Sequence, residues 1–121
     1  DITIISTGST TEAAMEAEKI LKERGISVRL IGMPTVYPLD EELVKDSAKK
    51  TKVILTVEEH YAEGGLGTLV SEACSTMTDC KVYRQGVPAL YATTGSYEEL
   101  LHYYQLDAEG IVKKVQEIVK K

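Results

Sequence analysis

Residues 53–67, which read VILTVEEHYAEGGLG, decide the fold. The first five are nearly unbroken apolar, which is typical of a central parallel strand that is buried on both faces. The polar residues 58–60 follow where this strand ends, and a glycine-rich turn leads from them into an apolar helical pattern. A buried strand that passes through a glycine turn into a helix is a building unit of α/β folds.

Strand-like runs alternate with amphipathic helical runs on both sides of this unit. We expect the central strand at Val53 to Val57 and the others at Ile2 to Ile5, Ser27 to Gly32 and Lys81 to Gln85. The last strand alternates only modestly, so it is predicted at or near an edge. Because no repeat or linker divides the chain, residues 1–121 are predicted to form one α/β domain with a largely parallel sheet.

Each expected helix has polar residues at its start and apolar residues at helical spacing. Ser9 with Glu12, and Ser96 with Glu99, are spaced as capping boxes. Asp40 and Asp107 are predicted N-caps, and Gly25 a left-handed C-cap. The predicted inward faces are Ala13, Ala14, Ala17, Ile20 and Leu21; Leu43, Val44 and Ala48; Leu66, Leu69, Val70 and Ala73; and Ile111, Val112, Val115, Ile118 and Val119.

The composition is that of an ordinary folded domain. Apolar residues make up 43% and charged residues 27%, and the net charge is -5 with acids and bases interspersed. No basic patch or long apolar run is present, so we expect neither nucleic acid nor a membrane as partner. Cys74 and Cys80 fit no CxxC or zinc spacing, which favours reduced thiols in a cytoplasm. The chain opens on Asp1 directly into a strand, so it is expected to be a piece of a larger protein.

Glu58, Glu59 and His60 are the strongest candidates for chemistry, because open α/β sheets bind ligands at the carboxyl ends of their strands. Carboxylates beside an imidazole could perform acid–base work. Neighbouring residues of a strand point to opposite faces, however, so Glu58 and Glu59 do not aim into one site. We therefore favour a helix cap or a subunit contact over catalysis.

Gly64, Gly65 and Gly67 could let backbone N–H groups approach a phosphate or carboxylate. The dinucleotide-binding pattern is incomplete, since position 70 is Val70 and no acidic residue follows at the ribose-binding distance. Close packing of a helix on a strand explains the same glycines. An anion contact and a purely structural turn both stay open.

Tyrosine is the only aromatic residue type, with seven copies. A buried tyrosine needs a partner for its hydroxyl, so these residues are predicted at interfaces. The interface candidates are Tyr61, Tyr91, Tyr97, Tyr103 and Tyr104. No nucleophile motif, metal-ligand cluster or phosphate-binding loop occurs, so no catalytic, cofactor-binding or metal residue is assigned.

Several short motifs, taken in order, resemble the C-terminal domain of transketolase. They are Ile2 to Ser9, Gly25 to Arg29, Met33-Pro34-Thr35, Pro38-Leu39-Asp40, Val57 to His60, Gly64 to Gly67, Gly86-Val87-Pro88, Thr94-Gly95-Ser96, Glu98 to Leu101 and Leu106 to Val112. The resemblance covers essentially the whole chain. Where the family usually has Phe-Gly-Glu-Ser-Gly, this chain has Tyr91 to Gly95, so no function is carried over to that turn.

The resemblance implies a three-layer α/β/α domain with a five-stranded sheet, mostly parallel, and one antiparallel edge strand. In the family this domain follows two thiamine-binding domains, which hold thiamine diphosphate, magnesium and the activating glutamate. The implied enzyme is a cytoplasmic homodimer that moves a two-carbon ketol unit between sugar phosphates. The implied role of this segment is dimer support and active-site architecture, so the segment alone is expected to be inactive and to bind no cofactor.

Two alternatives stay open. The first is the same module from deoxyxylulose-phosphate synthase or from the beta subunit of a 2-oxo acid dehydrogenase. The second is a free-standing module that binds a small anion or nucleotide at Gly64 to Gly67. His60 is expected to hold that turn or a subunit contact. Its replacement by alanine should therefore lower stability or dimerisation and leave the thiamine affinity of the full enzyme nearly unchanged.

Overall fold

The computed structural model describes residues 1–7, 10–33, 40–61, 66–77, 79–87 and 106–119, and leaves out the side chains of 59–61 and 87. Four parallel strands form one sheet in the order β2-β1-β3-β4. The strands are β1 (Ile2–Thr7), β2 (Val28–Met33), β3 (Val53–Tyr61) and β4 (Lys81–Val87). The helices are α1 (Thr10–Glu23), α2 (Glu41–Thr51), α3 (Leu66–Ala73) and α5 (Ala108–Val119).

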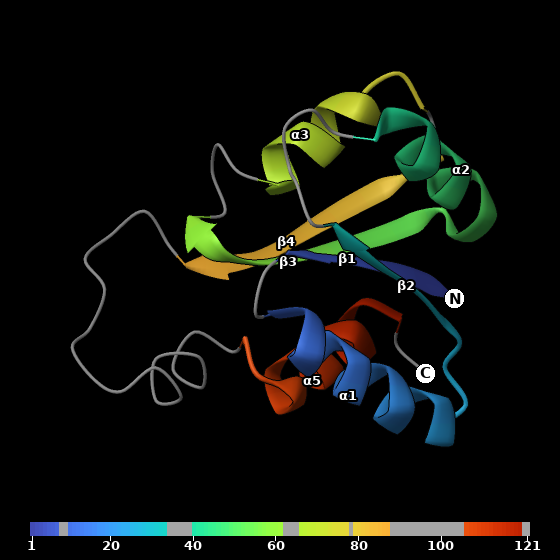
Figure 1. Cartoon of the computed structure of the whole chain (residues 1–121). Helices are drawn as coiled ribbons and strands as arrows, with labels where there is room; N and C mark the ends of the chain where they lie inside the picture. Colours follow the sequence, from blue (N-terminus) through green and yellow to red (C-terminus); the bar gives the residue numbers. More distant parts are fainter. Residues whose placement is uncertain (8–9, 34–39, 62–65, 78, 88–105, 120–121) are drawn as a thin grey trace.

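The helices cover both faces of the sheet. Figure 1 shows α2 and α3 on one face and α1 and α5 on the other. This is the expected three-layer α/β/α architecture, and β1 and β3 occupy the two inner positions of the described sheet. The expected antiparallel fifth strand does not lie among the described residues, so it stays a prediction. None of the described helices is long and apolar enough to cross a bilayer.

Two apolar clusters form, one on each face, because side chains alternate along the inner strands. Ile4 of β1 and Leu55 of β3 pack into the cluster beneath α1 and α5. Their neighbours Ile5 and Ile54 pack into the cluster beneath α2 and α3. The predicted inward helix faces are confirmed as buried or partly buried, and Ser47 is an additional buried residue of α2.

Several predicted caps are present. The Asp40 carboxylate accepts a hydrogen bond from the N–H of Leu43 at 3.1 Å, and the Asp107 carboxylate accepts one from Gly110 at 2.9 Å. Gly25 has φ of +80°, as expected for a left-handed cap. Ser9, Ser96 and the Tyr91 to Gly95 turn lie outside the described residues, so the proposed capping boxes and that turn are not described.

Three of the four described strands, β1, β3 and β4, extend further than the apolar patterns predicted. β3 continues through polar residues to Tyr61, which pairs with Val87 of β4 after an irregularity that begins beyond Val57. β4 is an outer strand of the described sheet, in agreement with the prediction of an edge or near-edge strand.

Candidate functional site

The candidate site lies at the carboxyl end of β3, where the chain enters α3. The side chain of Glu58 is only 1% exposed. Its Oε2 atom accepts a hydrogen bond from the N–H of Leu66 at 2.8 Å, and its Oε1 atom accepts one from Gly67 at 3.2 Å. The first turn of α3 has no acidic residue of its own. Glu58 therefore brings a negative charge to the positive end of the α3 dipole from a neighbouring strand.

This contact decides between the interpretations of Glu58. The structure uses it as a helix cap, which is one of the two roles that the sequence favours over catalysis. Because its two oxygens occupy the N–H groups of Leu66 and Gly67, those groups are not available to an external phosphate. This geometry weighs against an anion site at the α3 end of the glycine turn.

Gly67 lies where α3 approaches the sheet most closely. A Cβ atom at this position would lie 2.7 Å from Cδ of Arg84 and 3.0 Å from Oγ1 of the buried Thr56. The Arg84 side chain comes from β4, packs its aliphatic part against this glycine, and donates a hydrogen bond from Nη1 to Thr68 at 3.5 Å. Close helix–strand packing, one of the two interpretations of the glycine pattern, is therefore what the structure has at Gly67.

The chain reverses its direction across the sheet between β1 and β3, which is where open α/β sheets bind ligands. Thr10, at the start of α1, is 1% exposed and joins the ends of both strands. Its hydroxyl donates to the carbonyl oxygens of Thr7 at 2.5 Å and Val57 at 3.1 Å. At this edge of the sheet, the Thr10 hydroxyl and the Glu58 carboxylate therefore both have hydrogen-bond partners within the domain.

The remaining candidates are only partly placed. Glu59 and His60 belong to β3, but their side chains lie outside the described part, as do Gly64 and Gly65. Their predicted interface or anion contacts stay predictions. Among the described residues, no group of three or more His, Cys, Asp or Glu side chains could hold a metal ion.

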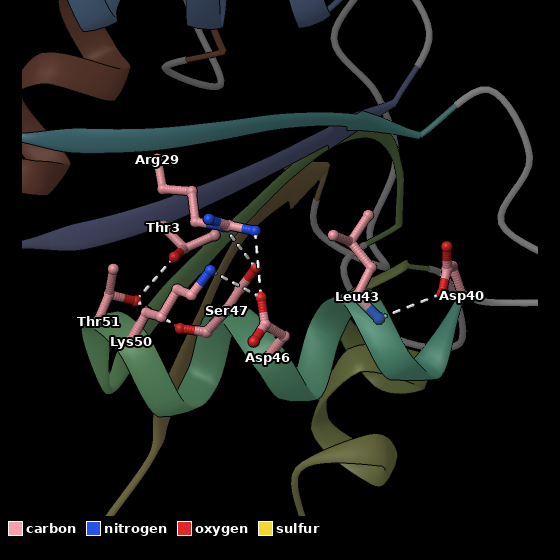
Figure 2. Close-up of polar contacts among 8 residues, drawn as sticks. All are labelled: Thr3, Arg29, Asp40, Leu43, Asp46, Ser47, Lys50 and Thr51. Atoms are coloured by element: carbon pink, nitrogen blue, oxygen red, sulfur yellow. Dashed lines mark hydrogen bonds and ion pairs between the residues drawn. The ribbon is translucent and has the colours of Figure 1, made fainter.

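A second polar cluster, missed by sequence analysis, ties α2 to the sheet (Figure 2). Nε of Arg29 donates to the buried Ser47 hydroxyl at 3.0 Å, and its guanidinium pairs with Asp46 at 3.4 Å. The hydroxyls of Thr3 and Thr51 share a hydrogen bond of 2.7 Å. The sequence did not predict this cluster, because small hydroxyl side chains such as Thr3, Ser47 and Thr51 are ordinary at inward positions of a helix or strand. This cluster has the character of a structural tie.

Comparison with known proteins identifies the family of this chain. The family model described as "Transketolase, C-terminal domain" matches residues 1–111. The chain belongs to the transketolase C-terminal domain family. A putative transketolase C-terminal section from Methanocaldococcus jannaschii is 42% identical over the whole chain, and a subunit of the apulose-4-phosphate transketolase of Phocaeicola vulgatus is 40% identical over the whole chain. This transketolase C-terminal domain spans 38% of each of these relatives.

The module also occurs beyond enzymes named transketolase. A 1-deoxy-D-xylulose-5-phosphate synthase from Dehalococcoides mccartyi is 37% identical over 98% of this domain, which spans 19% of that enzyme. Among solved structures, one described as "Split gene transketolase, inactive beta4 tetramer" matches 97% of the domain with a TM-score of 0.87 and 37% identity. The domain covers 37% of that chain. Fold and family therefore agree with the expected resemblance.

Proposed function

We propose that this chain is the C-terminal domain of a transketolase and that its role is assembly. In this proposal the thiamine-binding domains or subunit of the same enzyme hold thiamine diphosphate and magnesium and carry out ketol transfer between sugar phosphates. The likeness of nearly the whole chain to part of a split-gene transketolase chain carries the proposal. A cytoplasmic enzyme of sugar-phosphate metabolism, as in the pentose phosphate pathway, is the corresponding setting.

The contacts at the carboxyl edge support an architectural role. The Glu58 carboxylate caps α3 and the Thr10 hydroxyl joins β1 to β3, so both groups hold the edge in shape. A rigid edge of this kind suits a domain that presents a fixed surface to neighbouring domains. Glu59, His60 and the glycine turn would then contribute to that surface.

Ketol transfer tests the proposal directly. The chain is assayed with thiamine diphosphate, magnesium and sugar phosphates, first alone and then with the thiamine-binding part of the same enzyme. We expect no turnover alone and turnover when both parts are present, with reactions that lack thiamine diphosphate as controls. Turnover by the chain alone, or full activity of the thiamine-binding part without it, contradicts the proposal.

Deoxyxylulose-phosphate synthase is the second candidate, because one such enzyme is 37% identical over nearly the whole chain. The same reconstituted sample distinguishes the two functions. Ketol transfer without deoxyxylulose-phosphate formation supports transketolase, and the reverse result supports the synthase.

We also propose that the domain self-associates, with a two-fold dimer as the simplest closed assembly. Self-association is supported by the split-gene relative, which is described as a beta4 tetramer. Sedimentation over a wide range of concentrations should show a shift from monomer to dimer. A strictly monomeric species up to high concentration contradicts this part of the proposal. It would leave the predicted interface residues Tyr61, Tyr91, Tyr97, Tyr103 and Tyr104 without that role.

A further inference from the structure

The chain's two cysteines lie at the opposite end of α3 from the Glu58 cap. Cys74 directly follows α3, and Cys80 directly precedes β4. The N–H of Met77 donates to the carbonyl oxygen of Cys74 at 3.0 Å, which closes a turn after the helix. The N–H of Lys81 donates to the carbonyl oxygen of Lys52 at 3.0 Å, which fixes the start of β4. Backbone contacts thus anchor the connection at both ends.

The two thiols lie on the α2 and α3 side of the sheet. Each thiol is among the causes that shift the pKa of the other. Cys74 is 5% exposed and belongs to the apolar cluster there, while Cys80 packs against the same cluster and is only partly buried. Both are free thiols.

An open cavity of about 330 Å³ is lined by one of the two cysteines. Cys80 lines it together with Lys49 and Lys52, and Cys74 does not. A small reagent can therefore enter the cavity and reach Cys80 first. Cys74 does not line the cavity and lies in the apolar cluster against which Cys80 packs.

We propose that Cys74 and Cys80 are a modification site, at which a low-molecular-weight disulfide oxidises the pair to an intramolecular disulfide. The Cys80 thiolate attacks one sulfur of the reagent, whose S–S bond breaks and releases one thiolate. Cys74 loses its proton and attacks the Cys80 sulfur, which forms the protein disulfide and releases the second reagent thiolate. The protein loses two protons and two electrons, and the reagent is reduced to two thiols.

The environment makes this oxidation slow at neutral pH. Burial, then the charge and hydrogen bond of Cys74, raise the pKa of the Cys80 thiol to about 12. Burial also raises the pKa of Cys74, against the smaller opposing effects of the Cys80 hydrogen bond and Lys45. Only the thiolate attacks a disulfide, so the rate of the first step rises about tenfold per pH unit below the pKa. The site therefore responds to sustained oxidation or to alkaline conditions.

The disulfide would lock the connection between α3 and β4. It closes a short ring over residues 74–80 and restricts the unfolded chain, so oxidation should raise the midpoint temperature of unfolding. The lock lies away from the Glu58 cap, so the α3 N-terminus should keep its geometry. Oxidation thus changes stability and leaves the candidate site intact.

Oxidised glutathione tests the proposal on the full chain between about pH 7 and pH 9. We expect a mass loss of about 2 Da, faster at higher pH and reversed by a reducing agent. Cyanogen bromide cleaves after Met77, between the two cysteines, so the two flanking fragments should stay joined until reduction. A mixed disulfide with glutathione would leave the fragments separate, so the join together with the intact mass of a single chain identifies the intramolecular disulfide. An increase of the melting temperature by several degrees is expected with it.

Matched single variants separate the two steps. Cys74→Ala keeps the accessible thiol and should stop at a stable mixed disulfide with glutathione, whereas Cys80→Ser should react more slowly than either Cys74→Ala or the wild type. The proposal is overturned if the wild-type chain stays fully reduced at the highest pH, stops at the mixed disulfide, or forms only disulfides between molecules. Equal first-step rates in both variants would also overturn it, because Cys80 would then not be the entry point.

Discussion

At the residue scale, Glu58 shows what sequence could and could not predict. Alternation along the strand predicted that Glu58 and Glu59 face opposite sides, and position predicted a helix cap as one of its roles. Which backbone groups it binds could not be predicted, because Leu66 and Gly67 approach it only after the turn has folded back. The partner of a buried carboxylate is a tertiary property, and no local pattern encodes it.

Replacing Glu58 should destabilise the domain more than an ordinary surface cap does. Glu58→Gln places an amide NH2 group against one of the two N–H donors and should lower the free energy of unfolding by about 1–3 kcal/mol. Glu58→Ala leaves both donors unpaired and should lower it further. Urea unfolding followed by far-UV circular dichroism measures both. Asp40→Ala, which removes an exposed cap, is the control and should cost about 1 kcal/mol. Equal stability of Glu58→Gln and the wild type would show that the buried carboxylate is not needed.

The contact between Gly67 and Arg84 predicts a coupling between two residues. Gly67→Ala places a Cβ atom 2.7 Å from Cδ of Arg84, and this overpacking costs about 1–3 kcal/mol, partly offset by the better helix propensity of alanine. In an Arg84→Ala background the clash with the arginine disappears. A double-mutant cycle on the free energy of unfolding should therefore give a smaller loss for Gly67→Ala in that background. Additive losses would mean that another contact, such as Thr56, sets the cost.

At the element scale, strand cores were predicted well and strand ends poorly. Apolar runs located all four described strands, yet β3 continues past the apolar run to Tyr61 because it is still paired with β4. Pairing supplies backbone hydrogen bonds whatever the side chains are, so hydropathy underestimates such ends. Helix ends behaved similarly: the predicted caps Asp40 and Asp107 are present, whereas nothing in the sequence marked Lys52 as a left-handed cap.

The end of α2 offers a stabilising substitution. Lys52 has φ of +62°, a conformation that glycine adopts without strain, and its N–H bonds to the carbonyl oxygen of Ala48 at 2.8 Å. Lys52→Gly should therefore stabilise the domain by about 0.5–1 kcal/mol. This net gain already allows for the greater entropy that glycine gives the unfolded chain, which opposes it. Lys52→Ala removes the same charge without relieving the backbone, and it should change the stability little. The free energies of unfolding of the two variants test this prediction. If both variants are more stable than the wild type, the lost charge and not the relieved backbone strain explains the gain.

At the scale of the whole molecule, the architecture was predictable because each level of the sequence favours the same fold. The alternation of strands and helices predicted the parallel sheet, and the apolar faces predicted which sides of the helices are buried. The functional role was less accessible, because the proposed role in assembly depends on surfaces that other domains would cover. A domain that contributes architecture has no motif as specific as a nucleophile or a metal site.

The two apolar clusters should unfold together. They lie on opposite faces of the sheet, but adjacent residues of the same inner strands supply both, as Ile4 and Ile5 do in β1. Loss of the helices on one face would therefore expose those strands and remove support from the other. We expect one cooperative transition, in which both layers open at the same urea concentration.

Matched thiol probes can report on each layer separately. Cys74 in a Cys80→Ser variant reports on the α2 and α3 layer, and Val112→Cys in a chain without the native cysteines reports on the α1 and α5 layer. Both positions are 5% exposed, so alkylation of either requires opening of its layer. After correction for the stability of each variant, both should be alkylated over the same transition that far-UV circular dichroism records. Earlier alkylation of one probe would show that its layer opens alone, and the sheet would then not couple the two clusters.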